Sequence, residues 1–301
     1  MIISVSRRCD IPGFAFDWFL KKLDEGFVEV RNPFNPLQIK SVSLNPPAAG
    51  LPQENTAEVF AFWTRDPSSI NTHAFELGKR GYGFYVMTTL TSYPAVLEPL
   101  VLPAEKAIRA IKELALKITP DRVIWRYDPV FLSDITDSEF HKRNFTCLAA
   151  QLKGSVNRVI VSVYDEYGRA EKRLLALENG KILRKQAHYY IGPAGKKTLH
   201  PEVRKILAVL ADIAASNGME MQSCAEEDLS DCQIKPGACI DADYIAGLFG
   251  EKMPGLKNLG KDQGQKRPFC RCAKSTDIGS YGSCPAGCVY CYANTASAFE
   301  N

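Results

Sequence analysis

The chain has 301 residues, of which 46% are hydrophobic and 24% charged, a composition typical of a globular protein. Its 37 basic and 34 acidic residues give a net charge of +3, too small to indicate a nucleic-acid or anionic-membrane partner. No apolar run approaches the roughly 18 residues that a membrane helix requires, and the opening residues MIISVSRRCD lack the apolar stretch of a signal peptide. We therefore expect a cytoplasmic protein with no membrane partner.

Short apolar runs typical of strands alternate with helical patterns along most of the chain. The expected strands are 2–8, 27–33 with a hairpin partner at 39–46, 59–67, 83–91, 122–130, 157–167 and 219–226, and a further strand is expected near 269–275. The expected helices are 14–26, 69–79, 103–118, 138–152 and 201–218. The stretch 168–200 is polar, and 227–268 has the composition of an irregular excursion and linker.

This alternation predicts an α/β fold with a parallel sheet covered by helices. The number of strands and the chain length favour a TIM-like (β/α) barrel or partial barrel over an open doubly wound sheet. No G-x-G-x-x-G motif follows the first strand, so a dinucleotide fold is not indicated. Residues 1–226 would form the barrel body, and residues 227–301 a cysteine-rich segment that completes it and carries a metal cluster, within one integrated domain.

Polar and charged residues gather where the predicted strands end. The carboxyl ends of parallel strands meet on one face of the sheet, where active sites lie. Guanidinium groups bind carboxylate and phosphate bidentately, so the candidates for holding an anionic substrate are Arg7, Arg8, Arg31, Arg65 and Arg126. In the alternative interpretation these arginines pair with carboxylates such as those of Asp10 and Asp128, and their role is structural.

The cysteines are concentrated near the C-terminus, with eight of the ten at or after residue 224. In a cytoplasmic protein this distribution favours metal binding or catalysis over disulfides. The segment CPAGCVYCYAN places Cys284, Cys288 and Cys291 in the spacing C-x3-C-x2-C. Structural zinc prefers four protein ligands, whereas three cysteines on a [4Fe–4S] cluster leave one iron open to a small molecule.

This motif, followed by Tyr292 and Ala293, resembles the signature of the radical S-adenosylmethionine (SAM) superfamily, and is especially similar to the spore photoproduct lyase subgroup. The resemblance implies that Cys284, Cys288 and Cys291 bind a [4Fe–4S] cluster whose open iron chelates SAM. Reductive cleavage of SAM would then yield a 5′-deoxyadenosyl radical that abstracts hydrogen from a substrate. Tyr290 would lie near the adenine. The resemblance also implies an electron donor such as ferredoxin or flavodoxin, and a nucleotide or nucleic acid as one class of substrate.

Nearly the whole chain also resembles DUF1848, a domain-of-unknown-function family, which brings no known reaction. The shared segments are SVSRRCDIP, WTRDP, RYDP, SCAE and CRCAKSTDIGSYGSCPAGCVYCYAN. In radical SAM enzymes the cluster loop follows the first strand, whereas here it lies close to the C-terminus. Either the barrel is circularly permuted, with CRCAKSTDIG as its first strand in space, or the cluster is an appendage without SAM chemistry. We favour the permuted barrel.

The remaining cysteines leave several interpretations open. Cys224, Cys239, Cys270 and Cys272 are candidates for a second site, either an auxiliary iron–sulfur cluster or a structural zinc. Alternatively, one of them completes the first site, giving a fully ligated cluster for electron transfer or stability. The alternative to an enzyme is therefore a metal-binding barrel that recognises a phosphorylated or nucleic-acid ligand. A third class, a metal-free hydrolase, lacks a recognisable acid–base pair.

Overall fold

The computed structural model describes residues 1–47, 56–192, 195–250, 260–262 and 267–294. Its centre is an eight-stranded sheet in which every neighbouring pair of strands is parallel, in the order β12-β1-β4-β5-β6-β7-β10-β11. The strands are β1 (Ile2–Val5), β4 (Val59–Thr64), β5 (Gly83–Thr89), β6 (Val123–Val130), β7 (Arg158–Val163), β10 (Glu220–Cys224), β11 (Lys235–Gly237) and β12 (Thr276–Asp277).

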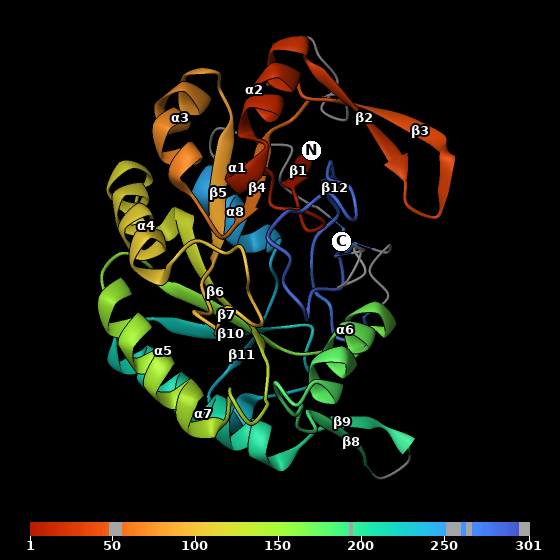
Figure 1. The fold of residues 1–301 in the computed structure, drawn as a ribbon. Helices are drawn as coiled ribbons and strands as arrows, with labels where there is room; N and C mark the ends of the chain where they lie inside the picture. The colour runs from red at the N-terminus through yellow and green to blue at the C-terminus, as the bar shows by residue number, and fades with distance from the viewer. Residues whose placement is uncertain (48–55, 193–194, 251–259, 263–266, 295–301) are drawn as a thin grey trace.

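Helices flank this sheet, and two antiparallel hairpins project from the body (Figure 1). The helices are α1 (Ile11–Phe14), α2 (Phe16–Glu25), α3 (Ser68–Lys79), α4 (Ala104–Ile118), α5 (Ser138–Leu152), α6 (Gly168–Asn179), α7 (Pro201–Ser216) and α8 (Ala242–Phe249). The hairpin strands are β2 (Phe27–Asn32) with β3 (Asn35–Ser43), and β8 (Tyr189–Ile191) with β9 (Lys197–Leu199). Short 3-10 turns are η2 (Pro120–Arg122) and η4 (Ser230–Cys232).

The central strands are buried on both faces, which explains why they read as continuous apolar runs. In β4 all six residues are buried. Phe60 and Phe62 face the large core that the sheet forms with α2 to α5 and α7. Trp63 belongs to a second core on the opposite face, which also contains residues of α8 and four of the cysteines. Helices α2 to α5 and α7 therefore cover one face of the sheet, and α8 with the four cysteines covers the other.

The structure confirms the parallel α/β sheet and the hairpin of residues 27–43, and it adds to or corrects the sequence analysis at four places. The hairpin forms a separate sheet. The strand expected near 269–275 is formed instead by Thr276–Asp277. The polar stretch 168–200 contains α6, and the stretch 227–268 contains β11 and α8, while residues 251–259 and 263–266 lie outside the described part. Short or polar elements of this kind depend on tertiary contacts more than on their own periodicity.

The two edge strands carry the C-terminal part of the chain. β11 pairs with β10 at one edge, and β12 pairs with β1 at the other, through Ile3 opposite Thr276 and Ser4 opposite Asp277. In the described residues β11 and β12 are not hydrogen-bonded to each other, so the strand order alone does not close a barrel. Both segments nevertheless belong to the sheet that the first 226 residues build.

Candidate functional site

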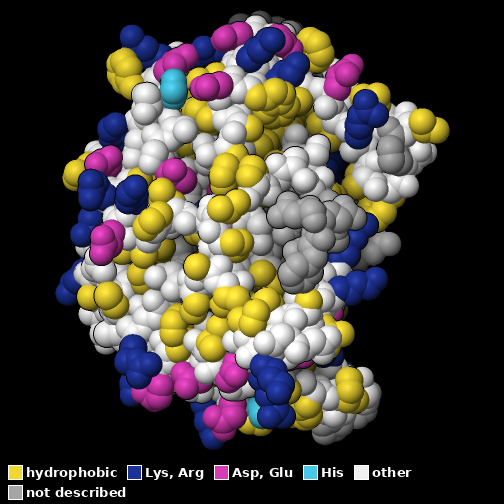
Figure 2. Space-filling model, viewed as in Figure 1, with side chains coloured by type: hydrophobic (Ala, Val, Ile, Leu, Met, Phe, Trp, Pro, Cys, Tyr) yellow, Lys and Arg dark blue, Asp and Glu magenta, His cyan; other side chains and the backbone are white. Residues whose placement is uncertain are grey.

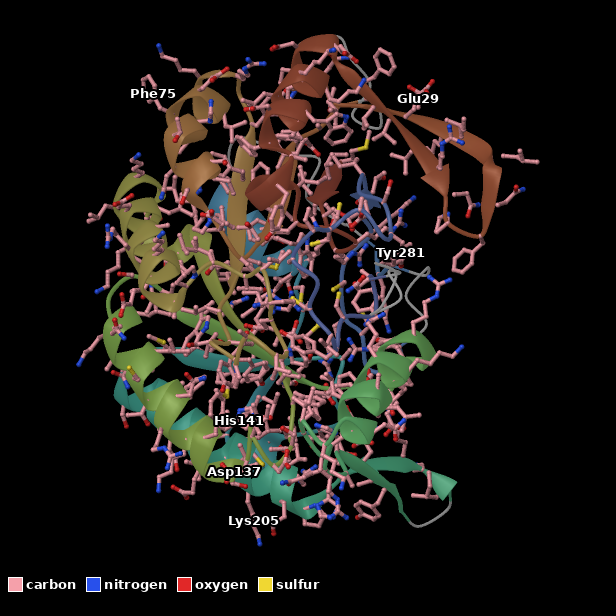
Figure 3. All side chains as sticks on the ribbon, viewed as in Figure 1. Glu29, Phe75, Asp137, His141, Lys205 and Tyr281 are labelled. Carbon is pink, nitrogen blue, oxygen red and sulfur yellow. The ribbon has the colours of Figure 1, made fainter. Side chains whose placement is uncertain are left out.

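The segment that follows β12, residues 278–294, is called the cysteine loop below. Because β12 runs parallel to β1, this loop leaves the sheet at the carboxyl ends of the strands, the edge where α/β proteins place their sites. Its backbone is joined to the loop after β5 by two hydrogen bonds, from Val289 N to Leu97 O at 3.0 Å and from Leu100 N to Ala286 O at 3.4 Å. Figure 3 labels Tyr281, a member of this loop.

The three cysteines of the motif lie together on the cysteine loop. Cys288 is buried, while Cys284 and Cys291 are partly exposed. Burial raises the pKa of Cys288 to about 12. The nearby Arg65 guanidinium lowers this pKa, and the negative charges of Glu98, Cys291 and Cys284 raise it further. The backbone N–H groups of Asp10 and Ala286 donate to the Cys284 sulfur. The three thiols are therefore close enough to interact electrostatically.

Arg173 of α6 holds the backbone of the cysteine loop. Its Nε donates to Val289 O at 2.9 Å, its Nη1 to Asn294 O at 2.9 Å and its Nη2 to Cys291 O at 2.5 Å. The residue is only 6% exposed, so its fork of donors satisfies three loop carbonyls in a mostly dry environment. One side chain thus fixes the backbone on both sides of the last cysteine.

Tyr290 points inward from the cysteine loop into a buried polar network. Arg65 Nη2 donates to its hydroxyl at 2.6 Å, and the hydroxyl in turn donates to Glu98. Arg65 also pairs with Glu98 at 3.0 Å and donates to Thr91 Oγ1 at 3.1 Å. The ring contacts Tyr93 edge-on, with 5.9 Å between centroids. Tyr290 therefore anchors the loop, and its proximity to a cofactor stays a prediction.

A cavity of about 220 Å³ opens beside this network. Its wall includes Arg65, Thr91 and Glu98 together with apolar residues of the segment that leads into α4. Small-molecule sites are concave and combine apolar walls with a few polar groups, and this cavity has both polar and apolar residues in its wall. The cavity lies next to the cysteine loop. Pro99, which is part of the cavity wall, is the nearest neighbour that a side chain at Gly287 would meet.

Arg7 and Arg8 converge on a single buried carboxylate, Asp277. Arg7 Nε lies 3.7 Å and Arg8 Nε 3.9 Å from Asp277, which also accepts hydrogen bonds from Ser4 Oγ at 2.8 Å and Ser6 Oγ at 2.6 Å. Arg7 additionally lies 3.5 Å from Asp262. Asp277 therefore joins the end of β1 to the start of the cysteine loop.

The other predicted arginines have different surroundings. Arg126 contacts Asp128, as the structural interpretation proposed, and its guanidinium lies 4.7 Å from the centroid of the Trp63 ring. Asp10 instead accepts from the backbone N–H of Arg65 at 2.7 Å and caps α1. The placement of Arg31 with the strand ends is wrong, because it lies exposed on the β2–β3 hairpin, outside the main sheet.

The four cysteines proposed for a second site come together in the buried core that contains Trp63. Cys239 Sγ lies 3.2 Å from Cys224 Sγ, and Cys272 is hydrogen-bonded through its side chain to both Cys239 and Cys270. The four thiols are called the four-cysteine cluster below. Figure 3 shows sulfur atoms near the middle of the molecule. Cys9, Cys147 and Cys232 are free thiols outside the cluster.

Several site residues were not singled out from the sequence. Glu98, Asp277 and Arg173 are partners from distant parts of the chain. Of these three, only Asp277 lies inside a segment that the sequence analysis quoted. Glu226 of SCAE is buried, accepts from Val163 N at 2.9 Å and Tyr189 Oη at 3.0 Å, and lies 3.8 Å from Arg267. Burial raises the pKa of Glu226 to about 7, the range of a proton-transfer group.

Fold and site together define a parallel α/β protein with two groups of cysteines, one on the loop that follows β12 and one in the buried core that contains Trp63. The family model described as a domain of unknown function (DUF1848) matches residues 2–293, so the chain belongs to the DUF1848 family. A comparison with curated proteins finds no match. No helix among the described residues is both long and apolar enough to cross a membrane.

Proposed function

We propose that the protein is an iron–sulfur enzyme of radical SAM type, in which Cys284, Cys288 and Cys291 hold a [4Fe–4S] cluster. The observation that carries this proposal is the position of the cysteine loop directly after β12, at the carboxyl edge of a parallel sheet. Three thiolates from one short loop match the donor set of a cluster with one open iron. When bound, such a cluster supplies one electron to SAM.

The chain's own residues supply a rigid support for such a cluster. Arg173 binds the carbonyls of Val289 and Cys291, and Tyr290 anchors the loop through Arg65 and Glu98. Cluster ligands must be held at fixed positions, and these buried hydrogen bonds restrict the backbone next to two of the three cysteines. This support favours a cofactor-binding loop over a surface appendage.

The charges near the loop favour a zwitterionic ligand over a polyanion. Arg65 is paired with Glu98, and Arg7 and Arg8 share Asp277. Because the positive charges are largely balanced within the protein, they do not create the strong field that a nucleic acid requires. The amino and carboxylate groups of SAM fit such alternating charges, and an anionic substrate would have to displace one of these pairs.

We also infer that the sheet is a partial barrel whose first strand in space is β12. Seven of the eight strands follow one another around the sheet in chain order, and β12 precedes β1. This is the order that a circularly permuted (β/α) barrel requires. A metal-binding barrel without radical chemistry is the second candidate function, and the contacts within the four-cysteine cluster favour it because they point to a metal outside the cysteine loop.

The test is electron paramagnetic resonance on anaerobically purified, dithionite-reduced protein, recorded with and without SAM. We expect a reduced [4Fe–4S] signal that changes on addition of SAM. Cys288→Ala should abolish the signal, because Cys288 is the buried central ligand of the motif. Cys147→Ala is the matched control, because Cys147 is exposed on α5, away from the cysteine loop.

Each alternative outcome has a definite meaning. A cluster signal that SAM does not change would favour a closed or electron-transfer cluster over the radical SAM proposal. A signal that survives in Cys288→Ala would show that other cysteines bind the cluster. Absence of iron in the anaerobic wild-type protein would overturn the proposal.

A further inference from the structure

The four-cysteine cluster joins three segments that are far apart in the sequence. Cys224 ends β10, Cys239 follows β11, and Cys270 and Cys272 precede β12. β11 and β12 are the two edge strands of the sheet, and the cluster connects the end of β10 and the segment after β11 with the segment before β12. A backbone hydrogen bond from Ala273 N to Ile240 O, 2.8 Å long, joins the same segments.

Packing in an apolar core does not explain why the four thiols contact one another. Each is buried, with 8% or less of the residue exposed, and each contacts another cysteine of the cluster. None is in a disulfide, and the 3.2 Å between Cys224 Sγ and Cys239 Sγ is well beyond the bond length of about 2.05 Å. An apolar core gains little from four mutually contacting thiols, whereas a metal ion needs this donor set.

The spacing fits one ion better than a four-iron cluster. Among the described residues, no three or more His, Cys, Asp or Glu side chains are already arranged as a metal site. The contact between Cys224 and Cys239 is 3.2 Å, whereas Zn–S bonds of about 2.3 Å set sulfur–sulfur edges of about 3.8 Å in a tetrahedron. A shift of a few tenths of an ångström per sulfur closes this difference. In a [4Fe–4S] cluster each cysteine binds a different iron, which requires sulfurs much farther apart.

The surroundings match the charge of a four-thiolate site. A divalent ion with four thiolates carries a net charge of about −2. Arg126 interacts electrostatically with Cys224 and Cys239, Arg267 with Cys224, and Arg7 with Cys272. Because these guanidinium groups also pair with Asp128, Glu226 and Asp277, they offset part of the negative charge, which is costly to bury unpaired.

Hydrogen-bond donors to the sulfur atoms of the four-cysteine cluster are also present. The backbone N–H of Ile240 donates to Cys272, and the N–H of Cys272 donates to Cys270. In addition, the buried Nε1 of Trp63 and Nε of Arg126 have no hydrogen-bond partner among the described residues. Trp63 belongs to the same buried core as the four cysteines. Unsatisfied buried donors call for an acceptor, and metal-bound thiolates accept such hydrogen bonds in the outer shell of a site.

We propose that Cys224, Cys239, Cys270 and Cys272 bind one zinc ion that links the two edges of the sheet. The ion replaces the thiol protons and fixes the end of β10, the turn after β11 and the segment before β12 to one another. The zinc ion thereby connects β11 to β12, whereas hydrogen bonds connect the neighbouring strands within the sheet. This site is separate from the cysteine loop and does not depend on the function proposed for it.

The test compares metal content across purified variants by mass spectrometry. We expect about one zinc per wild-type chain, about one per chain in Cys288→Ala, and at least a fivefold loss in Cys239→Ser. Cys232→Ser is the matched control, because Cys232 is equally buried but contacts the backbone of Arg204 instead of another cysteine. Zinc that persists in Cys239→Ser, or is lost equally in Cys232→Ser, would overturn the assignment.

A second measurement uses the wild-type chain, so that misfolding of a variant cannot decide the outcome. Zinc is removed with a chelator under reducing conditions and replaced by Co²⁺, whose visible spectrum distinguishes tetrahedral thiolate coordination from oxygen coordination. We expect a thiolate spectrum that saturates at one equivalent. Iron with acid-labile sulfide that is lost in Cys239→Ser would show a cluster in place of the single ion, and the absence of any thiolate cobalt band would show that the thiols bind no metal.

Discussion

Arg65 and Glu98 form a buried ion pair beneath the cysteine loop, with 3.0 Å between Arg65 Nη1 and Glu98 Oε1. Arg65 follows β4 and Glu98 lies between β5 and α4, and both contact the hydroxyl of Tyr290 on the loop. The pair thus connects three distant parts of the chain. It also shows that an arginine at a strand end can have a protein partner instead of a substrate.

Glu98→Gln should lower the free energy of unfolding by about 3 kcal/mol, because it leaves the Arg65 charge buried without a counter-charge. Denaturant unfolding of the metal-free and the reconstituted protein measures this change. Glu76→Gln is the control, since Glu76 forms an exposed pair with Arg80 and its loss should cost no more than about 1 kcal/mol. Equal losses in the two variants would show that the Arg65–Glu98 pair is not structural, and would restore Arg65 as a ligand-binding candidate.

Arg173→Gln should loosen the cysteine loop, because it removes three hydrogen bonds from a charged donor to loop carbonyls. We expect roughly 2–4 kcal/mol of lost stability and a lower iron content after reconstitution. Arg169→Gln, on the exposed side of α6, is the matched control. If both variants retain iron equally, the carbonyl contacts of Arg173 are not needed to hold the cluster.

Gly279→Ala should destabilise the protein, because the added methyl carbon would lie 2.0 Å from Ser6 Oγ and 2.8 Å from Cys9 Sγ. Overpacking of this kind costs about 1–3 kcal/mol. Gly247→Ala is the opposite control: nothing lies within 4 Å of the new carbon, and alanine in α8 should stabilise the helix by about 0.5–1 kcal/mol. Thermal unfolding of both variants provides the measurement. A stable Gly279→Ala protein would mean that the start of the cysteine loop is not packed tightly against β1.

His141 should make the protein less stable in acid. It is a buried residue of α5 (Figure 3), where Tyr127 Oη lies 2.9 Å from Nδ1 and Phe131 O lies 3.0 Å from Nε2. Burial lowers the pKa of His141 to about 4, whereas the unfolded chain has a histidine pKa of about 6.5. As the pH falls, the unfolded state therefore takes up a proton before the folded state does. The contribution of neutral His141 to the free energy of unfolding is complete above pH 6.5, and about 3 kcal/mol of it is lost as the pH falls to 4.

Comparison of wild-type protein with His141→Gln by urea unfolding between pH 7 and pH 4 checks this expectation. The variant lacks the titrating group, so the difference in unfolding free energy between the two proteins should shrink as the pH falls. Gln151→Ala, an exposed change on the same helix that carries no titratable group, should show a difference that is constant with pH. A constant difference for His141→Gln would contradict the lowered pKa.

Charged side chains of both signs are mixed over the periphery of the face in Figure 2, with hydrophobic side chains across its middle. This mixture agrees with the net charge of +3 and with the paired arginines at the strand ends. We therefore expect little dependence of ligand binding on ionic strength. Binding of SAM measured at low salt and at about 0.5 M salt should differ by less than about threefold, since only unpaired surface charges are strongly screened.

The amino-acid sequence by itself determined the local elements and the chemistry available to them. The apolar runs of β4 and β5 and the periodicity of α4 predict their structures because each carries enough buried residues in its own segment. The C-x3-C-x2-C spacing likewise places three thiols within reach of one another on any compact loop. Such features depend on neighbours in the chain, and sequence patterns report them directly.

Only the tertiary structure decided which distant groups meet. Asp277 contacts Ser4 across 273 residues, Tyr290 contacts Glu98 across 192, and Cys239 approaches Cys272 where the segment after β11 is hydrogen-bonded to the segment before β12. The sequence proposed the four cysteines as a set without being able to show their contact, and it misplaced Arg31. Long-range contacts follow from strand order and packing of the whole sheet, and no local pattern encodes them.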